Sequence, residues 1–171
     1  MILTRDKILE EVRLGHVRIE PFCEENVGPA SIDLTLDNKF RYFKKTADDD
    51  FFDIVEGLDF NDVTNSCEVT DRYILKPGET ILGITRETVF LPENICGWLQ
   101  GRSRFARVGL TVHITASFVH PGVSNKQVLE IHNEGPVALA LYPGTRICQL
   151  ILQRCEGGAK YAGRFEKQEL Y

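Results

Sequence analysis

Short strands dominate the pattern of apolar and polar positions along the chain. Between residues 28 and 36, apolar Ile32, Leu34 and Leu36 alternate with polar residues, which indicates a strand with one buried face. From residue 73 onward, apolar runs recur at a spacing of roughly ten residues, with Pro-Gly and Asn turns between them. The strands expected there span residues 73–75, 80–85, 88–91, 95–100, 110–116, 128–131, 137–141 and 147–152. This pattern predicts an all-β sandwich or barrel.

One short helix is expected before the strands, from Thr4 to Leu14. Thr4 can cap it, apolar residues share one of its faces, and Gly15 ends it. The charged stretch 44–50 is expected to be a solvated loop, and residues 51–62 show no clear period.

Length and charge narrow the class of protein. A chain of 171 residues is most simply one domain, here 1–171. Its net charge of −5 argues against generic nucleic-acid binding, so any anion site must be local. No apolar run approaches the roughly 18 residues that span a bilayer, and charged residues fill the stretch where a signal peptide would be apolar. We expect a cytoplasmic protein that binds neither nucleic acid nor membranes.

The metal-binding residue types do not form a recognisable site. The five cysteines are scattered without a C-x-x-C pair, and we expect them to be reduced and packed as small apolar residues. His132-Asn133-Glu134 has the H-x-E spacing of zinc nucleobase deaminases, but no C-x-x-C follows it. We therefore predict no zinc and no protein-bound metal. His113 is expected to be a hydrogen-bonded core histidine.

The densest group of cations lies between residues 101 and 110. Arg102, Arg104 and Arg107 fall within six residues and are accompanied by Ser103. Arginine forks and a hydroxyl are the donors that a triphosphate needs. The alternative is a surface network of salt bridges.

Glu130 lies within the apolar run 128–131. It can point to solvent, as most strand carboxylates do, or be buried and act as a general base on water. The tail after Gly157-Gly158 carries aromatic, cationic and amide side chains. It is either a frayed terminus or a lid, residues 157–171, that closes over an anionic ligand.

Five blocks of sequence carry a more specific signal. They are PASIDLTL at 29–36, GRSRFARVGL at 101–110, HITA at 113–116 followed by PG at 121–122 and VLE at 128–130, PGTRICQL at 143–150, and YAGRFEKQ at 161–168. Together, in this order, they resemble the motifs of the dCTP deaminase family, a branch of the dUTPase-like superfamily.

The resemblance implies a mainly β protomer, a distorted β-barrel or jelly roll of the dUTPase-like, β-clip type with a short N-terminal helix. It implies a homotrimer with nucleotide sites between subunits. The implied reaction is the zinc-independent hydrolysis of dCTP to dUTP and ammonia, which supplies dUTP for dTMP synthesis. Mg²⁺ would be bound through the nucleotide phosphates, and dTTP is a possible inhibitor.

The resemblance also implies roles for individual residues. Glu130 matches the catalytic glutamate, which takes a proton from water, and Ser103 and Arg107 match residues that orient the water and the glutamate. The phosphates would meet Arg102, Ser103, Arg104, Tyr161, Arg164 and Gln168. The other implied nucleotide-binding residues are Phe105, Ala106, Ala116, His120, Val128 and Leu129.

The chain departs from the family pattern at four positions. Arg104 replaces a serine, Val123 replaces a common aromatic residue, and Arg164 replaces a lysine. His120 replaces the aspartate of the turn, a position expected to meet the 3′-hydroxyl of the sugar, and this change disfavours hydrolysis of the phosphates. The alternatives are a bifunctional enzyme that forms dUMP and pyrophosphate, a plain dUTPase, or a non-catalytic nucleotide-binding regulatory protein.

Overall fold

The computed structural model describes residues 1–45, 47, 51–163, 168 and 170. The strands in chain order are β1 (Arg18–Glu20), β2 (Ile32–Phe43), β3 (Thr64–Glu68), β4 (Tyr73–Leu75), β5 (Thr80–Phe90), β6 (Ile95–Gly101), β7 (Leu110–Thr111), β8 (Phe118–Val119), β9 (Ser124–Asn133), β10 (Leu139–Leu141) and β11 (Arg146–Arg154). The helices are α1 (Arg5–Arg13), the single-turn α2 (Ser103–Ala106), and the 3₁₀ turns η1 (Glu24–Asn26) and η2 (Phe60–Asp62).

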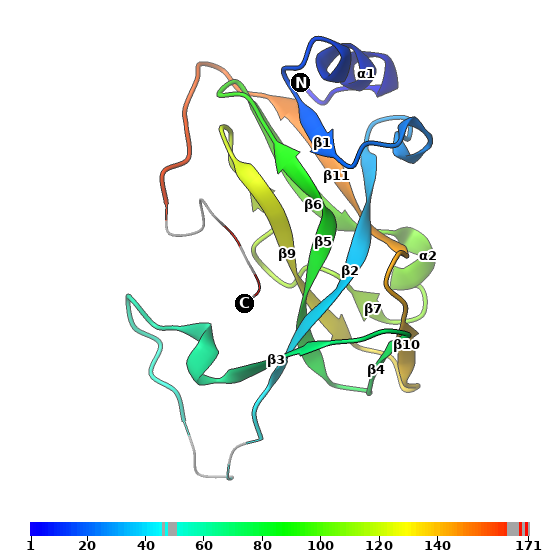
Figure 1. Cartoon of the computed structure of the whole chain (residues 1–171), viewed down its shortest axis with the longest axis vertical. Coiled ribbons are helices and arrows are strands. Elements are labelled where there is room, and N and C mark those ends of the chain that lie inside the picture. The colour runs from blue at the N-terminus through cyan, green and yellow to red at the C-terminus, as the bar shows by residue number, and fades with distance from the viewer. Residues whose placement is uncertain (46, 48–50, 164–167, 169, 171) are drawn as a thin grey trace.

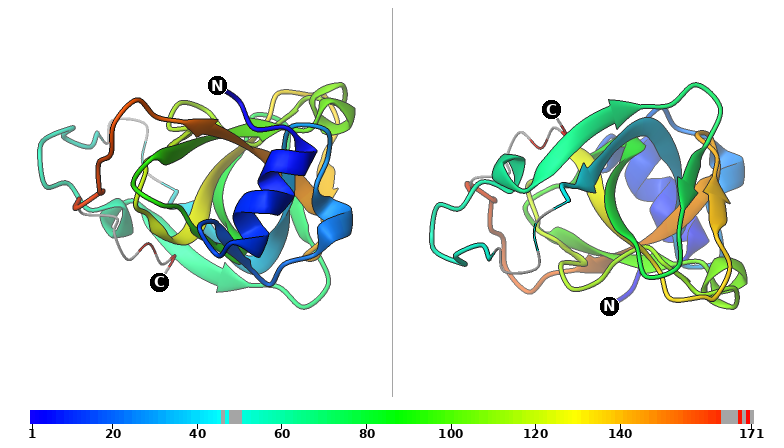
Figure 2. Two further views of the ribbon diagram at one scale, coloured as in Figure 1. Left: turned by 90° about the horizontal axis from the view of Figure 1, so that it is seen from above. Right: turned by 90° about the horizontal axis from the view of Figure 1, so that it is seen from below.

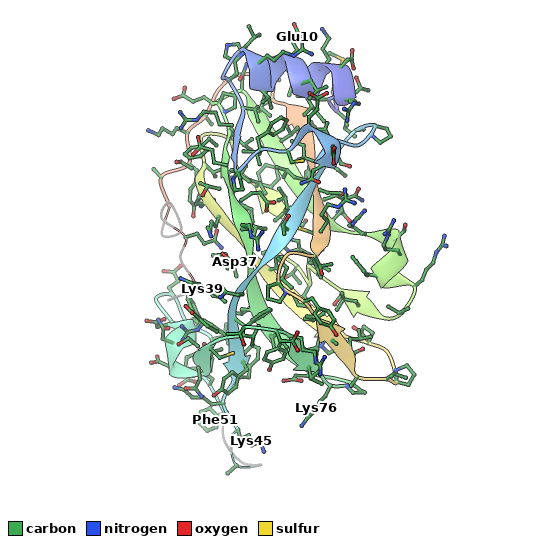
Figure 3. The ribbon with its side chains drawn as sticks, turned by 45° about the vertical axis from the view of Figure 1, so that its right-hand side comes forward. Glu10, Asp37, Lys39, Lys45, Phe51 and Lys76 are labelled. Atoms are coloured by element: carbon green, nitrogen blue, oxygen red, sulfur yellow. The ribbon has the colours of Figure 1, made fainter. Side chains whose placement is uncertain are left out.

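Most of the strands form one antiparallel sheet that curls into a half-barrel (Figure 1). Its hydrogen-bonded path runs β7–β9–β5–β2–β11–β6–β8, while β1 pairs with β5 and β3 pairs with β2. Helix α1 lies across one end of the half-barrel (Figure 2), and the small β4–β10 sheet lies at the other. Figure 3 marks these two ends by Glu10 on α1 and Lys76 next to β4. The predicted mainly β fold is confirmed.

The inside of the half-barrel is filled by the apolar residues that alternate along the strands. Ile32, Leu34 and Leu36 of β2 are at most 1% exposed, as the alternation predicted. Leu129 and Ile131 of β9 are fully buried against them. Each such side chain contributes about 1.5–3 kcal/mol relative to an exposed position, so the curl of the sheet is stabilised mainly by this shared core.

Several strand boundaries differ from the predicted ones. The expected strands 80–85 and 88–91 form one strand, β5, whose register against β9 shifts between Ile84 and Thr88. The expected strand 110–116 is wrong after Thr111, because the chain leaves the sheet there and returns only at β8. The strand expected at 128–131 extends over the whole of β9. The sequence did not predict β1, β3 and β8, because these strands are too short to show a clear alternation of apolar and polar residues.

The half-barrel has an open seam between β8 and β9. Within the described residues, β7 pairs with β9 only at His132 and Asn133. Residues 124–131 of β9 therefore form an unpaired sheet edge on that side. On the other side of the seam, β8 pairs with β6 at the end of the sheet. The turn around Pro121 and Gly122 joins β8 to β9 at one end of this seam.

Helix α1 is anchored to the last strand of the sheet. It spans Arg5–Arg13 and is followed by Gly15 with φ +73°, as the sequence predicted. Buried Glu11 forms an ion pair with Arg154 of β11, and its Oε2 lies 2.9 Å from Nδ1 of His16. Thr4 occupies the N-cap, but its hydroxyl donates to the Asp6 carboxylate instead of capping the backbone. No helix in the described part of the chain is long and apolar enough to cross a membrane.

Candidate active site

A cavity of about 380 Å³ opens at the seam. Six of the residues that were predicted to bind a nucleotide line it, namely Ala116, His120, Val128, Glu130, Tyr161 and Gln168. Its walls also contain residues that sequence reasoning missed, namely Phe60, Asn125, Gln127 and Leu170. The strand alternation could have placed Gln127 inside the barrel, but only the tertiary structure brings Phe60 and Leu170 to this cavity. The described lining residues include no lysine or arginine.

Glu130 is held by the segment that leaves the sheet after β7. Its Oε2 accepts hydrogen bonds from the backbone N–H groups of Ile114 and Thr115, each at 3.0 Å. Hydrogen bonds to an ionised carboxylate are stronger than neutral ones, so these two amides fix the carboxylate at the cavity wall. The side chain is half-buried, which answers the question that its sequence context left open.

His113 lies beside this arrangement without hydrogen bonds of its own. Neither of its buried ring nitrogens has a hydrogen-bond partner among the described residues, so the expectation of a hydrogen-bonded core histidine is wrong. Burial lowers the pKa of His113, against the opposing effect of the Glu130 charge. The ring is therefore neutral at pH 7. It lines a second cavity of about 400 Å³, together with Ala106, Thr111 and Thr115.

The arginine cluster lies on and around α2, away from the Glu130 cavity. The side chain of Arg102 is largely buried. Its Nη2 lies 3.0 Å from Asp33 Oδ2, and its Nη1 donates a hydrogen bond to the carbonyl of Arg146. In this conformation Arg102 anchors α2 to β2 and β11. Ser103, Arg104 and Arg107 are exposed. None of these four residues lines the cavity that contains Glu130.

The remaining predicted residues occupy different places. Phe105 packs in a small apolar pocket with Leu139, and Ala106 lines the second cavity. The side chain of Leu129 is fully buried in the core, so only its backbone is available to a ligand. Arg164 lies outside the described residues.

The described part of the C-terminal tail lies against the mouth of the Glu130 cavity, on the side of the molecule where Figure 1 draws the chain in orange to red. Tyr161 donates its backbone N–H to the carbonyl of Pro121 at 3.0 Å, and its ring stacks on His120 with centroids 5.0 Å apart. The turn leaves room for this contact because Gly122 has φ +75°, and a Cβ there would come within 2.9 Å of Lys160. Further along, the carbonyl of buried Leu170 accepts a hydrogen bond from Arg41.

The metal-ligand and thiol groups of the described residues can be considered together. Among the described residues, no three or more His, Cys, Asp or Glu side chains lie close enough together to hold a metal ion. Cys96 and Cys148 are buried, and burial raises the pKa of both thiols. These two cysteines pack as small apolar residues, as expected.

The family model described as dCTP deaminase-like matches residues 2–155. The chain belongs to the dCTP deaminase-like family. Two relatives within this family carry the name "dCTP deaminase, dUMP-forming". The one from Parafrankia sp. (strain EAN1pec) is 37% identical over 98% of this chain and 87% of its own length. The one from Streptomyces coelicolor is 36% identical over 98% of this chain and 91% of its own length.

Solved structures show the same fold for this dCTP deaminase-like chain. The 2′-deoxycytidine 5′-triphosphate deaminase from Agrobacterium tumefaciens superposes with a TM-score of 0.69 at 18% identity, covering 91% of this chain. This chain spans about half of the length of that one, 48%. A mutant dUTPase from phage phi11 of S. aureus superposes with a TM-score of 0.52 at 12% identity, covering 86% of this chain and 96% of its own. The dUTPase-like fold predicted from the sequence motifs is confirmed.

Proposed function

We propose that this protein catalyses the zinc-independent hydrolysis of dCTP to dUTP and ammonia, and so supplies dUTP for dTMP synthesis. The observation that carries the proposal is Glu130, a carboxylate fixed by two backbone amides at the wall of a nucleoside-sized cavity. Family membership and the names of relatives 36–37% identical over nearly the whole chain support the deamination of dCTP.

Glu130 serves as the general base in this reaction. Because Oε2 is held by Ile114 and Thr115, Oε1 takes the proton from a water molecule. The water oxygen then bonds to C4 of cytosine, and Glu130 passes this first proton to ring N3, where it stays. Glu130 next takes the proton of the new C4 hydroxyl and delivers it to the amino group. When the C4–N bond breaks, ammonia leaves and C4 keeps the new oxygen as a carbonyl. The neutral ring of His113 leaves the negative charge of Glu130 undiminished.

The open edge of β9 provides groups that can hold the pyrimidine. The backbone N–H of Gln127 points towards β5, where it donates to Thr85 Oγ1. Successive residues of a strand point their backbone groups to opposite sides, so those of Val128 and Glu130 are directed to the seam. A donor and an acceptor at this spacing suit the edge of a cytosine ring.

The phosphates require cations, and none lies among the described lining residues of the cavity. A triphosphate carries about four negative charges and is bound through arginine forks and hydroxyls, whereas the described walls include neither lysine nor arginine. We therefore propose a homotrimer in which α2 of a neighbouring copy brings Ser103, Arg104 and Arg107 to the cavity, with Ser103 and Arg107 orienting the water and Glu130. Mg²⁺ would arrive bound to the phosphates, and Tyr161, Arg164 and Gln168 of the tail would close over them. Arg102, as an anchor of α2, would support this arrangement.

The identity of the released product depends on the turn that carries His120. The ring of His120 lies between the edge of Phe118 and the face of Tyr161, and it offers no carboxylate to activate a second water. We therefore propose that dUTP is released. The second candidate is formation of dUMP and pyrophosphate, which the names of the two relatives favour.

A product assay tests both candidates. Purified protein is incubated with dCTP and Mg²⁺, and nucleotides, ammonia and pyrophosphate are measured over time, with and without dTTP. Equal amounts of dUTP and ammonia are expected, with a lower rate if dTTP occupies the same cavity. Formation of dUMP and pyrophosphate would establish the second candidate. If dCTP and dUTP both remain unchanged, the protein has a binding or regulatory role instead.

A further inference from the structure

A pair of carboxamides lies in the wall of the Glu130 cavity. Gln127 Nε2 donates a hydrogen bond to Asn125 Oδ1 at 2.7 Å, and the two residues are only 6% and 7% exposed. The neighbouring wall residues Leu99, Val119 and Val123 are apolar. Burying a carboxamide costs free energy unless hydrogen bonds within the protein replace those lost to water. The fold therefore has to place these two side chains where such hydrogen bonds can form.

An irregularity of the sheet provides that positioning. The register between β5 and β9 shifts next to Thr85, whose hydroxyl accepts the backbone N–H of Gln127 at 2.9 Å. The same hydroxyl donates to the carbonyl of Glu87 at 2.9 Å. The carboxylate of Glu87 in turn accepts the backbone N–H of Thr35 at 2.8 Å. This buried chain of hydrogen bonds connects three strands and fixes the position of Gln127.

The pair lies on the side of Glu130 where the sugar of a nucleotide has to be. In deoxycytidine the sugar is attached at N1, across the ring from C4, so it extends away from the catalytic carboxylate. Along β9 the cavity continues from Glu130 towards Asn125 and Gln127 and not towards residues 131–133. Gln127 precedes Glu130 by three residues, or roughly 10 Å along a strand.

We propose that Asn125 and Gln127 bind the 3′-hydroxyl of deoxycytidine. A hydroxyl both donates and accepts, and a carboxamide pair offers both partners. His120, which the sequence motifs indicated for this contact, has its ring engaged with Phe118 and Tyr161. The inference rests on the proposed function for the identity of the substrate.

The test compares dCTP with 2′,3′-dideoxy-CTP, which lacks only the 3′-hydroxyl. We expect the wild-type kcat/KM to be about 10- to 100-fold higher for dCTP, because a polar site rejects a ligand that leaves its groups unpaired. In Gln127→Leu this ratio should fall towards one. In the control Gln153→Leu, which removes an exposed amide bonded to Trp98, the ratio should remain that of the wild type. An unchanged ratio in Gln127→Leu, or no preference in the wild type, would overturn the proposal.

Binding measurements separate this inference from the proposed reaction. The two nucleotides are titrated into Glu130→Gln, alone and combined with Gln127→Leu, and the ratio of their Kd values is compared. The ratio should depend on Gln127 in the same way, even if the chain binds dCTP without deaminating it. If Gln127→Leu fails to fold, Asn125→Asp takes its place, because it keeps the size of the side chain but removes the amide donor. If dCTP and 2′,3′-dideoxy-CTP bind Glu130→Gln with similar Kd values while Gln127 is intact, the proposed contact to the 3′-hydroxyl is wrong. This holds whether or not the wild-type protein deaminates dCTP.

Discussion

Glu130 illustrates how much a single residue depends on backbone that is distant in the sequence. A carboxylate on a strand at the open seam of a curled sheet has many possible orientations. Two N–H groups from residues 114 and 115 select one of them. Because those groups come from a segment that has left the sheet, they are free to bond the side chain instead of a neighbouring strand.

The proposed role of Glu130 as a base predicts a clear separation of binding from turnover. Glu130→Gln keeps the size of the side chain and an oxygen that can accept the two amide hydrogen bonds. We expect dCTP binding within a few-fold of the wild type, whereas kcat should fall by about 10²–10⁴-fold, since general-base catalysis is worth that much. Calorimetric titration and a rate assay measure the two quantities. A variant that retains full turnover would disprove the assignment.

At the scale of elements, two buried charged side chains attach peripheral segments to the sheet. Glu11 joins α1 to β11, and Arg41 joins the tail to β2 and β3. In both cases an ionised group is hydrogen-bonded to more than one element, so removing either group leaves buried partners without compensation.

The Glu11 contact should make stability depend on pH in the acid range. Burial raises the pKa of Glu11, but the hydrogen bonds from His16 and Arg154 outweigh it and hold the pKa below its ordinary value. Because the pKa of Glu11 is lower in the folded than in the unfolded protein, its charge stabilises the fold. This stabilisation is fully present above the unfolded pKa of about 4.3 and is lost as the pH falls through the folded pKa. We expect Glu11→Gln to cost about 1.5–3 kcal/mol at pH 7.

Urea unfolding at pH 7 and at pH 3.5 measures this effect. The difference between the wild type and Glu11→Gln should shrink at the lower pH, because the unfolded wild type takes up a proton on Glu11 below its unfolded pKa of about 4.3. Glu10→Gln is the matched control, because Glu10 is an exposed neighbour that pairs with Lys7, and it should change stability little at either pH. An equal loss for Glu11→Gln at both values would mean that the charge of Glu11 is irrelevant.

Arg41 should control how firmly the tail is held. Its Nε donates to Thr64 Oγ1 at 2.8 Å, its Nη1 donates to the Leu170 carbonyl at 3.0 Å, and its guanidinium lies over Phe60. Arg41→Met removes these contacts, so the tail should open roughly tenfold more often, the factor that about 1.4 kcal/mol represents. Limited trypsin digestion at Lys160 and beyond reports the opening. The exposed Arg72→Met serves as the control, and equal cleavage rates in both variants would contradict the role of Arg41.

At the scale of the whole molecule, the two halves of the expected site lie apart within one chain. The half proposed to handle the base is at the seam, and the exposed Ser103, Arg104 and Arg107 do not line the cavity there. A symmetric assembly can combine such halves, because each copy gives one half to a neighbour and receives the other half in return.

Mixing two inactive variants tests that assembly. Glu130→Gln and Arg107→Ala should each have little activity alone, but co-expressed chains should form some sites with an intact Glu130 and an intact neighbouring Arg107. In a random trimer about one quarter of the sites are of this kind, so about a quarter of the wild-type rate is expected. The double variant co-expressed with Glu130→Gln should show no recovery. Absence of recovery in verified mixed oligomers would place the whole site within one chain.

The sequence alone determined the features that depend on neighbouring residues. Helix α1, the alternating strands and the Pro-Gly turns follow from local periodicity and turn chemistry, and these elements are present in the structure. The motifs around Arg102–Arg107 and Glu130 also indicated the family correctly, because their residue types and order along the chain are sufficient for that.

The tertiary structure alone decided where those residues lie relative to one another. Periodicity extended a strand through residues 112–116, whereas the chain leaves the sheet there to bond Glu130. It also could not show that β8 and β9 remain unpaired across the seam, that Asn125 and Gln127 line the cavity, or that Leu170 is buried near Arg41. Each of these depends on contacts between segments that are far apart in the chain, and such contacts are determined by the closure and packing of the whole sheet, not by the local pattern of residues.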